Sequence, residues 1–370
     1  MSTTPWYKLR DEDQVDTPAL VIFRDRVASN IDALIASIDD IQRLRPHVKT
    51  HKSAEVTRML VDKRITKFKC ATISEAEMLA ESGAKDILLA HQPVGPKMMR
   101  LLALTQRFPL IRWATLIDNT ATAKSLSDIF SASGKTLEYF FDLNVGMNRS
   151  GIDPTHVPGL FGEIHSLPGI SLRGLHVYDG HIRDADFSKR TERCDAAFAP
   201  VPTLLEKLSR QVDQPLIIVA GGSPTYPIHA RRKGIECSPG TFIYWDKGYE
   251  TILSEQKYLH AAVLLTRVIS VPAPNTICLD LGHKAIASEN PIDKRISLLN
   301  TDDLEPIGHS EEHMVFRVTG DNHYKVGDVI YGIPYHVCPT VALYDTAYVA
   351  QDNTITDRWQ TLSRNRKITI

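Results

Sequence analysis

Between residue 18 and about residue 245, short apolar runs rich in β-branched residues alternate with longer segments of helical period. This alternation is typical of repeated βα units. Eight runs are expected to form strands, at residues 18–23, 44–48, 67–71, 86–90, 111–117, 138–144, 172–178 and 215–221. Eight units predict a closed (β/α)8 TIM-type barrel, although a doubly wound open sheet would give much the same alternation.

The pattern changes after residue 250. Runs such as AAVLLTRVISV and HMVFRVTG are apolar or alternating over strand length, with turn residues between them and little helical period. Such runs indicate β-structure. We therefore expect an α/β fold in which a barrel at residues 18–250 is followed by a mostly β C-terminal domain at residues 251–370. An N-terminal segment, residues 1–17, is expected to pack with that second domain.

Composition narrows the class of partner. The chain has 370 residues, of which 43% are hydrophobic and 24% are charged, and its formal net charge is -1. This balance gives no global positive field for nucleic acid or an anionic membrane, so neither is a predicted partner. The sequence shows no run of about 18 apolar residues and no signal-peptide pattern, and its five cysteines lack CxxC spacing. We expect a cytoplasmic protein.

The carboxyl ends of the expected barrel strands carry polar residues, and catalytic groups of such folds collect there. The second run leads into RPHVKTHKS, which places His47, Lys49, His51 and Lys52 at this edge. The segment could be a solvated basic loop. Alternatively, a lysine near other cations has a lowered pKa and can attack a carbonyl carbon.

Two further strand ends could bind anions. DLNVGMNRSG offers Asn148, Arg149 and Ser150 to an oxygen anion, and VAGGSPTYP offers two glycines with Ser223 and Thr225 to a phosphate. A second glycine loop, SPGTFIYWD, follows closely. Each segment taken alone could equally be an ordinary turn.

The C-terminal domain contains YHVCPTVALYD, in which His336 and Cys338 are two residues apart. On a strand these side chains would share one face and could bind one zinc ion, leaving open coordination positions that suit a catalytic metal. A half-buried histidine and cysteine without a metal are the alternative.

Together these segments resemble the fold type III pyridoxal phosphate enzymes, and among them the D-threonine aldolase and D-serine dehydratase family with its alanine racemase-like barrel. The resemblance extends over nearly the whole chain. Five segments carry it in the family's order, namely DTPALVIFRDRVASNI, RPHVKTHKS, KFKCATISEAEML, DLNVGMNRSG and YHVCPTVALYD.

The resemblance implies a cofactor site. Lys49 would bind pyridoxal 5'-phosphate as a Schiff base, with Lys52 as the rival lysine and His47 nearby. Arg149 would contact the phenolic oxygen, and Tyr178, flanked by Asp179 and His181, would lie against the pyridine ring. The phosphate would be held by Gly221, Gly222, Ser223, Thr225, Gly240 and Thr241. The segment GGSPTYP departs from the family's usual glycine-rich run, which leaves the phosphate contacts open.

The resemblance also implies a divalent metal at His336 and Cys338. The aldolases typically show His and Asp at this spacing, and the dehydratases show His and Cys. A thiolate favours zinc, whereas a carboxylate accommodates manganese or magnesium. We therefore expect a homodimeric lyase that dehydrates a small D-3-hydroxy amino acid, such as D-serine or D-3-hydroxyaspartate, to a 2-oxo acid and ammonia. Retro-aldol cleavage to glycine and an aldehyde, racemisation, and a non-catalytic cofactor carrier are the alternatives, in that order.

Overall fold

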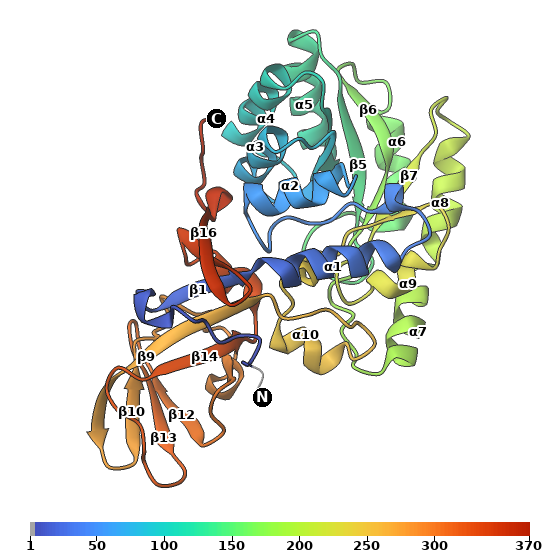
Figure 1. Cartoon of the computed structure of the whole chain (residues 1–370). Helices are drawn as coiled ribbons and strands as arrows, with labels where there is room; N and C mark the ends of the chain where they lie inside the picture. Colours follow the sequence, from blue (N-terminus) through green and yellow to red (C-terminus); the bar gives the residue numbers. More distant parts are fainter. Residues whose placement is uncertain (1–3) are drawn as a thin grey trace. The chain divides into compact units, whose positions relative to one another are not determined.

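A computed structural model describes residues 4–370. Of the predicted N-terminal segment, residues 1–17, the first three lie outside the described residues. The chain divides into two compact units. One comprises residues 34–49, 54–240 and 365–370, and contains a parallel sheet. The other comprises, among the described residues, 4–33, 50–53 and 241–364, and is mostly β. We call them the barrel unit and the β unit and describe each by itself (Figure 1).

The sheet of the barrel unit has seven parallel strands in sequential order. They are β2 (Lys67–Cys70), β3 (Asp86–Leu89), β4 (Arg112–Ile117), β5 (Leu137–Leu143), β6 (Ile170–Val177), β7 (Ile217–Ala220) and β8 (Ile235–Cys237). Residues 44–48 form parallel bridges to both edge strands, between Leu44 and Cys237 and between His47 and Lys69. This segment therefore occupies the eighth position and closes the predicted (β/α)8 barrel.

The helices of the barrel unit alternate with its strands along the chain, except that two helices, α7 and α8, lie between β6 and β7. They are α2 (Ala54–Asp62), α3 (Ile73–Glu81), α4 (Pro96–Arg107), α5 (Thr120–Ala132), α6 (Val157–Ile164), α7 (Phe187–Phe198), α8 (Pro200–Ser209) and α9 (Tyr226–Ala230). Helices α2 to α6 contact one another in sequence. Side chains of Thr72, Asn119 and Asp186 cap α3, α5 and α7 by accepting backbone N–H bonds, which fixes where these helices begin.

The barrel interior is layered. Near the amino ends of the strands, Arg45 bonds to Asp86 and Glu236, and Arg173 bonds to Asp86. Above this charged layer lies an apolar layer of Leu88, Leu116, Phe140 and Val219. Toward the carboxyl ends the interior becomes polar again, with Lys69 on β2, Asp142 on β5 and His176 on β6.

The predicted strand at residues 18–23 belongs to the other unit. It forms β1 (Ala19–Phe23), which pairs with β9 (Ala262–Ala273) and β15 (Thr346–Gln351), and it is followed by α1 (Arg24–Ala36). All five residues of β1 are buried, so its composition resembles that of a barrel strand. The barrel instead gains β8, a strand of three residues that the apolar pattern did not identify.

The nine-stranded sheet of the β unit surrounds a core to which the N-terminal segment contributes Leu9 and Val15. Its remaining strands are β10 (Thr276–Leu279), β11 (Ile296–Leu298), β12 (Leu304–His309), β13 (Met314–Val318), β14 (Val329–Pro334) and β16 (Thr354–Gln360). Two short helices accompany them, α10 (Lys247–Ile252) and α11 (Val337–Val341). Among residues 4–370, no helix combines the length and apolar character needed to span a bilayer.

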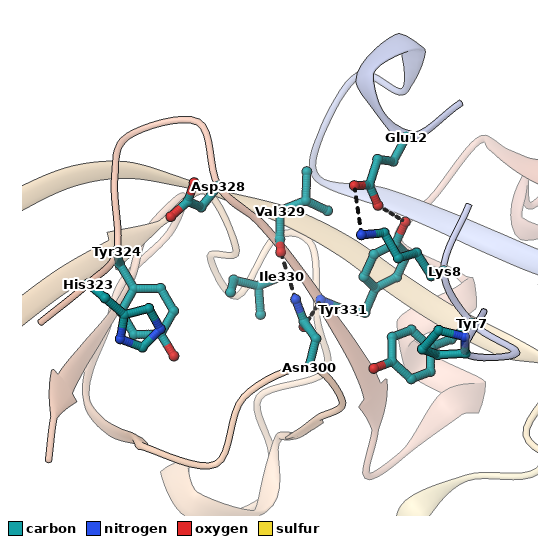
Figure 2. Close-up of a pocket in the computed structure, with 11 residues that line it drawn as sticks. Tyr7, Lys8, Glu12, Asn300, His323, Tyr324, Asp328, Val329, Ile330 and Tyr331 are labelled. Carbon is teal, nitrogen blue, oxygen red and sulfur yellow. Dashed lines mark hydrogen bonds and ion pairs between the residues drawn. The ribbon is translucent and has the colours of Figure 1, made fainter. Parts of the chain in front are cut away.

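A cavity of about 480 Å³ opens in the β unit beside the N-terminal segment (Figure 2). Tyr7, Lys8 and Glu12 line it from that segment, and Asn300 and Tyr331 line it from the sheet. Its polar groups largely bond to one another: the hydroxyl of Tyr331 donates to Glu12, and the side-chain oxygen of Asn300 accepts the N–H of Tyr331. The first bond ties the N-terminal segment to the sheet, and the second ties the loop after β11 to β14.

Candidate functional site

The predicted site residues fall into two groups. Those in the barrel unit are His47, Lys49, Arg149, Tyr178, Gly221, Gly222, Ser223, Thr225 and Gly240. Those in the β unit are Thr241, His336 and Cys338, together with the rival lysine, Lys52. The geometry of each group is described within its own unit.

Three cations surround the half-buried ring of Tyr178 just beyond β6. The guanidinium carbon of Arg149 lies 4.8 Å from the ring centroid, and the Nζ atoms of Lys49 and Lys69 lie 5.9 and 5.5 Å from it. The barrel therefore brings Lys49, Arg149 and Tyr178 together, as the sequence predicted. Lys69 was not predicted as a site residue. The signal that could have indicated it is a lysine between the apolar residues Phe68 and Cys70 of a predicted strand.

Two glycines leave room for the Tyr178 ring. A Cβ atom on Gly180 would lie 2.4 Å from the hydroxyl oxygen of Tyr178, and a Cβ on Gly222 would lie 3.1 Å from its Cε2. Real Cβ atoms do not approach other atoms as closely as 2.4 Å, so a larger residue at Gly180 would displace the ring, whereas one at Gly222 would crowd it by a few tenths of an ångström. Gly222 was predicted as a site residue, whereas Gly180 was not.

The structure separates the two candidate lysines. Nδ1 of His47 accepts the backbone N–H of Lys49 at 3.2 Å, so His47 supports the Lys49 turn. Lys52 lies in the β unit with a φ of 51°, and its carbonyl accepts the N–H of Ser363 at 3.2 Å. Lys49 is thus the candidate that shares the barrel interior with Arg149 and Tyr178.

Two glycine-containing loops follow the adjacent strands β7 and β8. The backbone N–H of Gly240 donates to Oγ of Ser223 at 3.4 Å, and the N–H of Ser238 donates to the Ala220 carbonyl at 3.2 Å. The hydroxyl of Ser238 is buried and has no hydrogen-bond partner among the described residues. A buried orphan hydroxyl beside two glycine loops fits an anion such as phosphate.

Thr225 has a different environment from the one predicted. Its hydroxyl donates to Oδ1 of Asp179 at 2.6 Å and accepts the N–H of Gly222 at 3.4 Å. Because its hydrogen is directed at Asp179, this hydroxyl is not available to donate to a phosphate. Thr225 instead holds the loop in shape.

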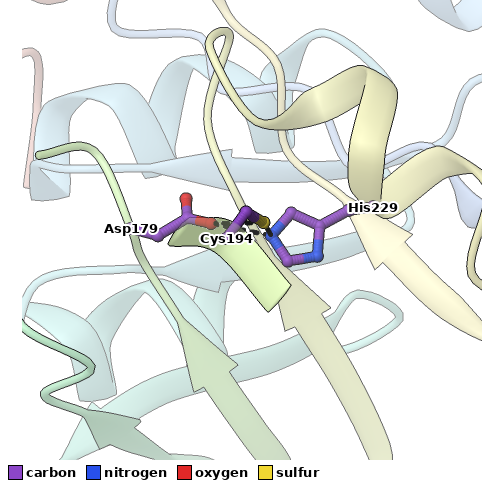
Figure 3. A group of neighbouring side chains, drawn as sticks. All are labelled: Asp179, Cys194 and His229. Atoms are coloured by element: carbon purple, nitrogen blue, oxygen red, sulfur yellow. Dashed lines mark hydrogen bonds and ion pairs between the residues drawn. The ribbon is translucent and has the colours of Figure 1, made fainter. Parts of the chain in front are cut away.

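Asp179 is the centre of a buried cluster with Cys194 and His229 (Figure 3). Nε2 of His229 lies 2.8 Å from Asp179, and its Nδ1 lies 2.5 Å from a guanidinium nitrogen of Arg232. Since Arg232 can only donate, Nδ1 accepts and Nε2 carries the hydrogen that bonds to Asp179. Burial raises the pKa of Cys194 to about 12. The cluster is therefore a protonated thiol and an imidazole that hold Asp179, and through it Thr225.

In the β unit, the prediction that His336 and Cys338 lie on a strand is wrong. Strand β14 ends at Pro334, His336 is the N-cap of α11, and Cys338 lies in the first turn of that helix. The two side chains still lie close enough to interact, since Cys338 is one of the groups that raise the pKa of His336. The N–H of Val337 between them donates to buried Asp246 at 3.1 Å, which fixes the start of the helix.

Further polar groups surround the pair. Nδ1 of His336 lies 2.5 Å from Oε1 of Glu289, and Sγ of Cys338 lies 3.1 Å from Oγ1 of Thr50. The hydroxyl of Thr241 is 3.8 Å from the same sulfur. Burial lowers the pKa of His336, but the thiol of Cys338 and the carboxylate of Glu289 outweigh it and raise this pKa to about 9. The surroundings of this imidazole thus favour positive charge, as at a cation site.

Comparison with known proteins follows this division. Residues 22–247 match the model of the alanine racemase N-terminal domain, and residues 261–350 match that of a putative serine dehydratase domain. The chain belongs to the alanine racemase N-terminal domain family. It is 28% identical to D-threonine aldolase from Arthrobacter sp over 95% of this chain and 93% of that protein. It is 24% identical to D-serine dehydratase from Dictyostelium discoideum over 93% of this chain and 95% of that protein.

Among solved structures, D-threonine aldolase from Filomicrobium marinum has the same fold, with a TM-score of 0.86 and 24% identity over 98% of this chain and 99% of that one. The predicted family resemblance and fold class are confirmed. The relatives are lyases acting on D-amino acids, so the chain is a pyridoxal phosphate-dependent lyase.

The barrel residues fit this cofactor. Pyridoxal phosphate carries a phosphate, a phenolic oxygen and an aldehyde, and the barrel unit offers glycine loops with the orphan hydroxyl of Ser238, the guanidinium of Arg149 and the amine of Lys49. The donors of the β unit fit a divalent metal, since an imidazole and a thiol in contact are ligands that zinc prefers.

Proposed function

We propose that this lyase dehydrates a D-3-hydroxy amino acid of the D-serine or D-3-hydroxyaspartate type and releases a 2-oxo acid and ammonia. The pairing of His336 with Cys338 carries the proposal, because both lie within the residues that match the serine dehydratase domain model. The similarity to D-threonine aldolase supports retro-aldol cleavage as the second candidate reaction.

Lys49 is the proposed cofactor-binding and catalytic amine. Pyridoxal phosphate, when bound, withdraws the electrons released at the substrate's α-carbon. Nζ of Lys49 takes the α-proton as a general base, and Arg149 offers its guanidinium to the phenolic oxygen. Tyr178 would pack against the pyridine ring, and Gly180 and Gly222 leave room for the Tyr178 ring to do so.

The two glycine loops are proposed to hold the phosphate. Gly221, Gly222 and Gly240 let the backbone approach it, and Ser223 and Ser238 supply hydroxyls. Thr225 contributes by fixing the loop through Asp179, and Thr241 follows the second loop.

His336 and Cys338 are proposed to bind a divalent metal, with zinc preferred over manganese or magnesium because of the thiolate. Such an ion supplies a Lewis acid for the substrate's β-hydroxyl. Glu289 holds Nδ1 of His336, which leaves Nε2 as the ligand atom. We also expect a cytoplasmic homodimer.

Product analysis by NMR tests this function. Cofactor-loaded protein is mixed with D-serine, D-threonine or D-3-hydroxyaspartate, each with zinc, with manganese and with chelator. We expect ammonia and a 2-oxo acid, formed with zinc and lost on chelation. The variants His336→Ala and Cys338→Ala should retain the cofactor and lose metal and activity, while His313→Ala, an exposed histidine of the same unit, should lose neither.

Other products would contradict dehydration in different ways. Glycine with an aldehyde would assign the aldolase reaction despite Cys338. Exchange of the α-proton alone, independent of metal, would indicate a racemase, and no reaction of any substrate would indicate a cofactor carrier. Full metal occupancy in both the His336 and Cys338 variants would remove the metal site.

A further inference from the structure

Lys69 is a fully buried amine that the proposed reaction leaves unused. It lies on β2, its side chain is among the largest that are completely enclosed, and only 2% of the residue is exposed. Its Nζ reaches to 3.4 Å from Nε2 of His176 on β6 and 3.5 Å from the carbonyl of Gly221. Since β2 and β6 are four strands apart in the eight-position barrel, the side chain crosses the barrel interior.

His176 is held so that it can only accept from Lys69. Its Nδ1 lies 2.7 Å from Oδ1 of Asp142, its register partner on β5, and the other oxygen of Asp142 accepts the hydroxyl of Ser150 at 2.9 Å. Burial alone would raise the pKa of Asp142, but the hydrogen bonds from His176 and Ser150 keep it low. An ionised carboxylate accepts hydrogen bonds only, so Nδ1 carries the hydrogen; burial lowers the pKa of His176 and favours the neutral ring, whose Nε2 lone pair then faces Lys69.

The backbone places Lys69 next to the cofactor-binding segment. The N–H of Val48 donates to the Lys69 carbonyl at 3.0 Å, and His47 forms a parallel bridge with Lys69. Lys49 follows directly, and both lysine amines face the ring of Tyr178. Both amines thus border the space around this ring, with Lys69 fully buried and Lys49 half-buried.

The charges around Lys69 act on its protonation. Burial first, and then the charge of Lys49, lower the pKa of Lys69 to about 7, while Asp142 and Asp179 act in the opposite direction. The titratable and charged groups that act on Lys69 or border the same space are Lys49, Arg45, Arg149, His176, Tyr178, Asp142 and Asp179. An electrostatic interaction between two sites acts equally on both, so the pair carries a second positive charge only at a cost, and Lys69 regains proton affinity when the nitrogen of Lys49 is neutral.

We propose that Lys69, fixed by His176 and Asp142, is a positioning residue that disfavours positive charge on the nitrogen of Lys49 and so tunes the acid–base behaviour of the cofactor-binding amine. A neighbouring cation is an established means of keeping a lysine nucleophilic. The inference rests on the proposed role of Lys49, but not on which bond of the substrate is broken.

The test is a pH titration of the visible absorbance of the holoprotein without substrate, from pH 5 to pH 10. Lys69→Met removes the charge, and Lys69→Gln removes it while keeping a donor toward His176 and Gly221. We expect both variants to move the midpoint upward by about one pH unit or more, a roughly tenfold change in proton affinity. Lys67→Met is the matched control, since Lys67 lies on the same strand and pairs with Glu236 at 2.6 Å. Its midpoint should equal that of the wild type.

Three results would overturn the proposal. The midpoints of both Lys69 variants could equal the wild-type value, or the wild-type absorbance could remain unchanged up to pH 10. The visible band could also disappear in the Lys69 variants and persist in Lys49→Ala, which would make Lys69 the cofactor-binding lysine. Because no turnover is measured, a protein that binds the cofactor but converts none of the three substrates would contradict the proposed function and leave this result standing.

Discussion

Glu289 lies 2.5 Å from Nδ1 of His336, so the carboxylate fixes the orientation of the imidazole and leaves Nε2 for a metal. Metal-binding histidines usually have such a carboxylate partner, and its loss typically lowers metal affinity about 10- to 100-fold. We expect Glu289→Gln to release metal at correspondingly lower chelator concentration, measured by metal analysis after competition dialysis.

Glu305→Gln is the control for this measurement. Glu305 also carries an exposed carboxylate in the β unit, where it pairs with Arg317 at 3.6 Å. Equal metal affinity in the Glu289 and Glu305 variants would show that the carboxylate of Glu289 does not support the site.

The choice between Lys49 and Lys52 has a spectroscopic test. Nζ of Lys49 faces Tyr178 in the barrel unit, whereas Lys52 belongs to the β unit. We expect Lys49→Ala to abolish the visible absorbance of lysine-bound cofactor and Lys52→Ala to retain it. The reverse pattern would assign the cofactor to Lys52.

Gly180 should be intolerant of a methyl group. Its Cβ would meet the Tyr178 hydroxyl at 2.4 Å, so Gly180→Ala must displace the ring. We expect cofactor affinity to fall roughly tenfold, a cost of about 1.4 kcal/mol in binding, measured by fluorescence titration of the apoprotein. Gly162→Ala on α6 meets no atom within 4 Å and should instead stabilise the fold by about 0.5–1 kcal/mol. Unchanged affinity in Gly180→Ala would mean that the position of the ring does not matter for binding.

The charged layer at the amino end of the barrel should dominate acid stability. Two buried arginines, Arg45 and Arg173, bond to Asp86 and hold its pKa well below the usual range despite burial. Because the folded-state pKa is lowered, this stabilisation is present above about pH 4 and is lost as the pH falls toward the folded-state value.

Asp86→Asn removes this carboxylate. We expect a loss of about 3 kcal/mol at pH 7, since the two buried arginines lose their shared carboxylate and keep only Glu236 and Glu138 as counter-charges. The difference from wild type should narrow in acid, as urea denaturation at pH 7 and pH 3.5 would show. Glu206→Gln, at an exposed pair with Arg210, should change stability by less than about 0.5 kcal/mol. A constant difference at both pH values would contradict the assigned role of Asp86.

The apolar pattern predicted the fold because it reports burial, but burial does not specify a sheet. Residues 19–23 are buried throughout and could have paired in either unit, and only long-range pairing with β9 and β15 assigns them to the β unit. Residues 235–237 are too few for a pattern to reveal. For VCPTV, β-branched residues favoured a strand, yet Asp246, 91 residues earlier, caps the backbone as a helix.

The candidate site was predictable where a residue follows a strand and not where it points across the barrel. Lys49, Arg149 and Tyr178 come at strand ends and meet as expected. Lys69 and His176 lie inside strands, and their contact depends on barrel closure, which no local pattern encodes. Thr225 was predicted to bind phosphate because the local sequence shows no partner for its hydroxyl. Its partner, Asp179, is 46 residues away along the chain, and no local pattern indicates their hydrogen bond.

The apolar layer of Leu88, Leu116, Phe140 and Val219 divides the barrel interior into two polar regions with different tasks. The ion pairs of Arg45 and Arg173 lie toward the amino ends of the strands and support folding, and the amines that support chemistry lie toward the carboxyl ends. Residues of the second region can therefore be exchanged over evolution for a new substrate, while the ion pairs of the first keep the barrel closed.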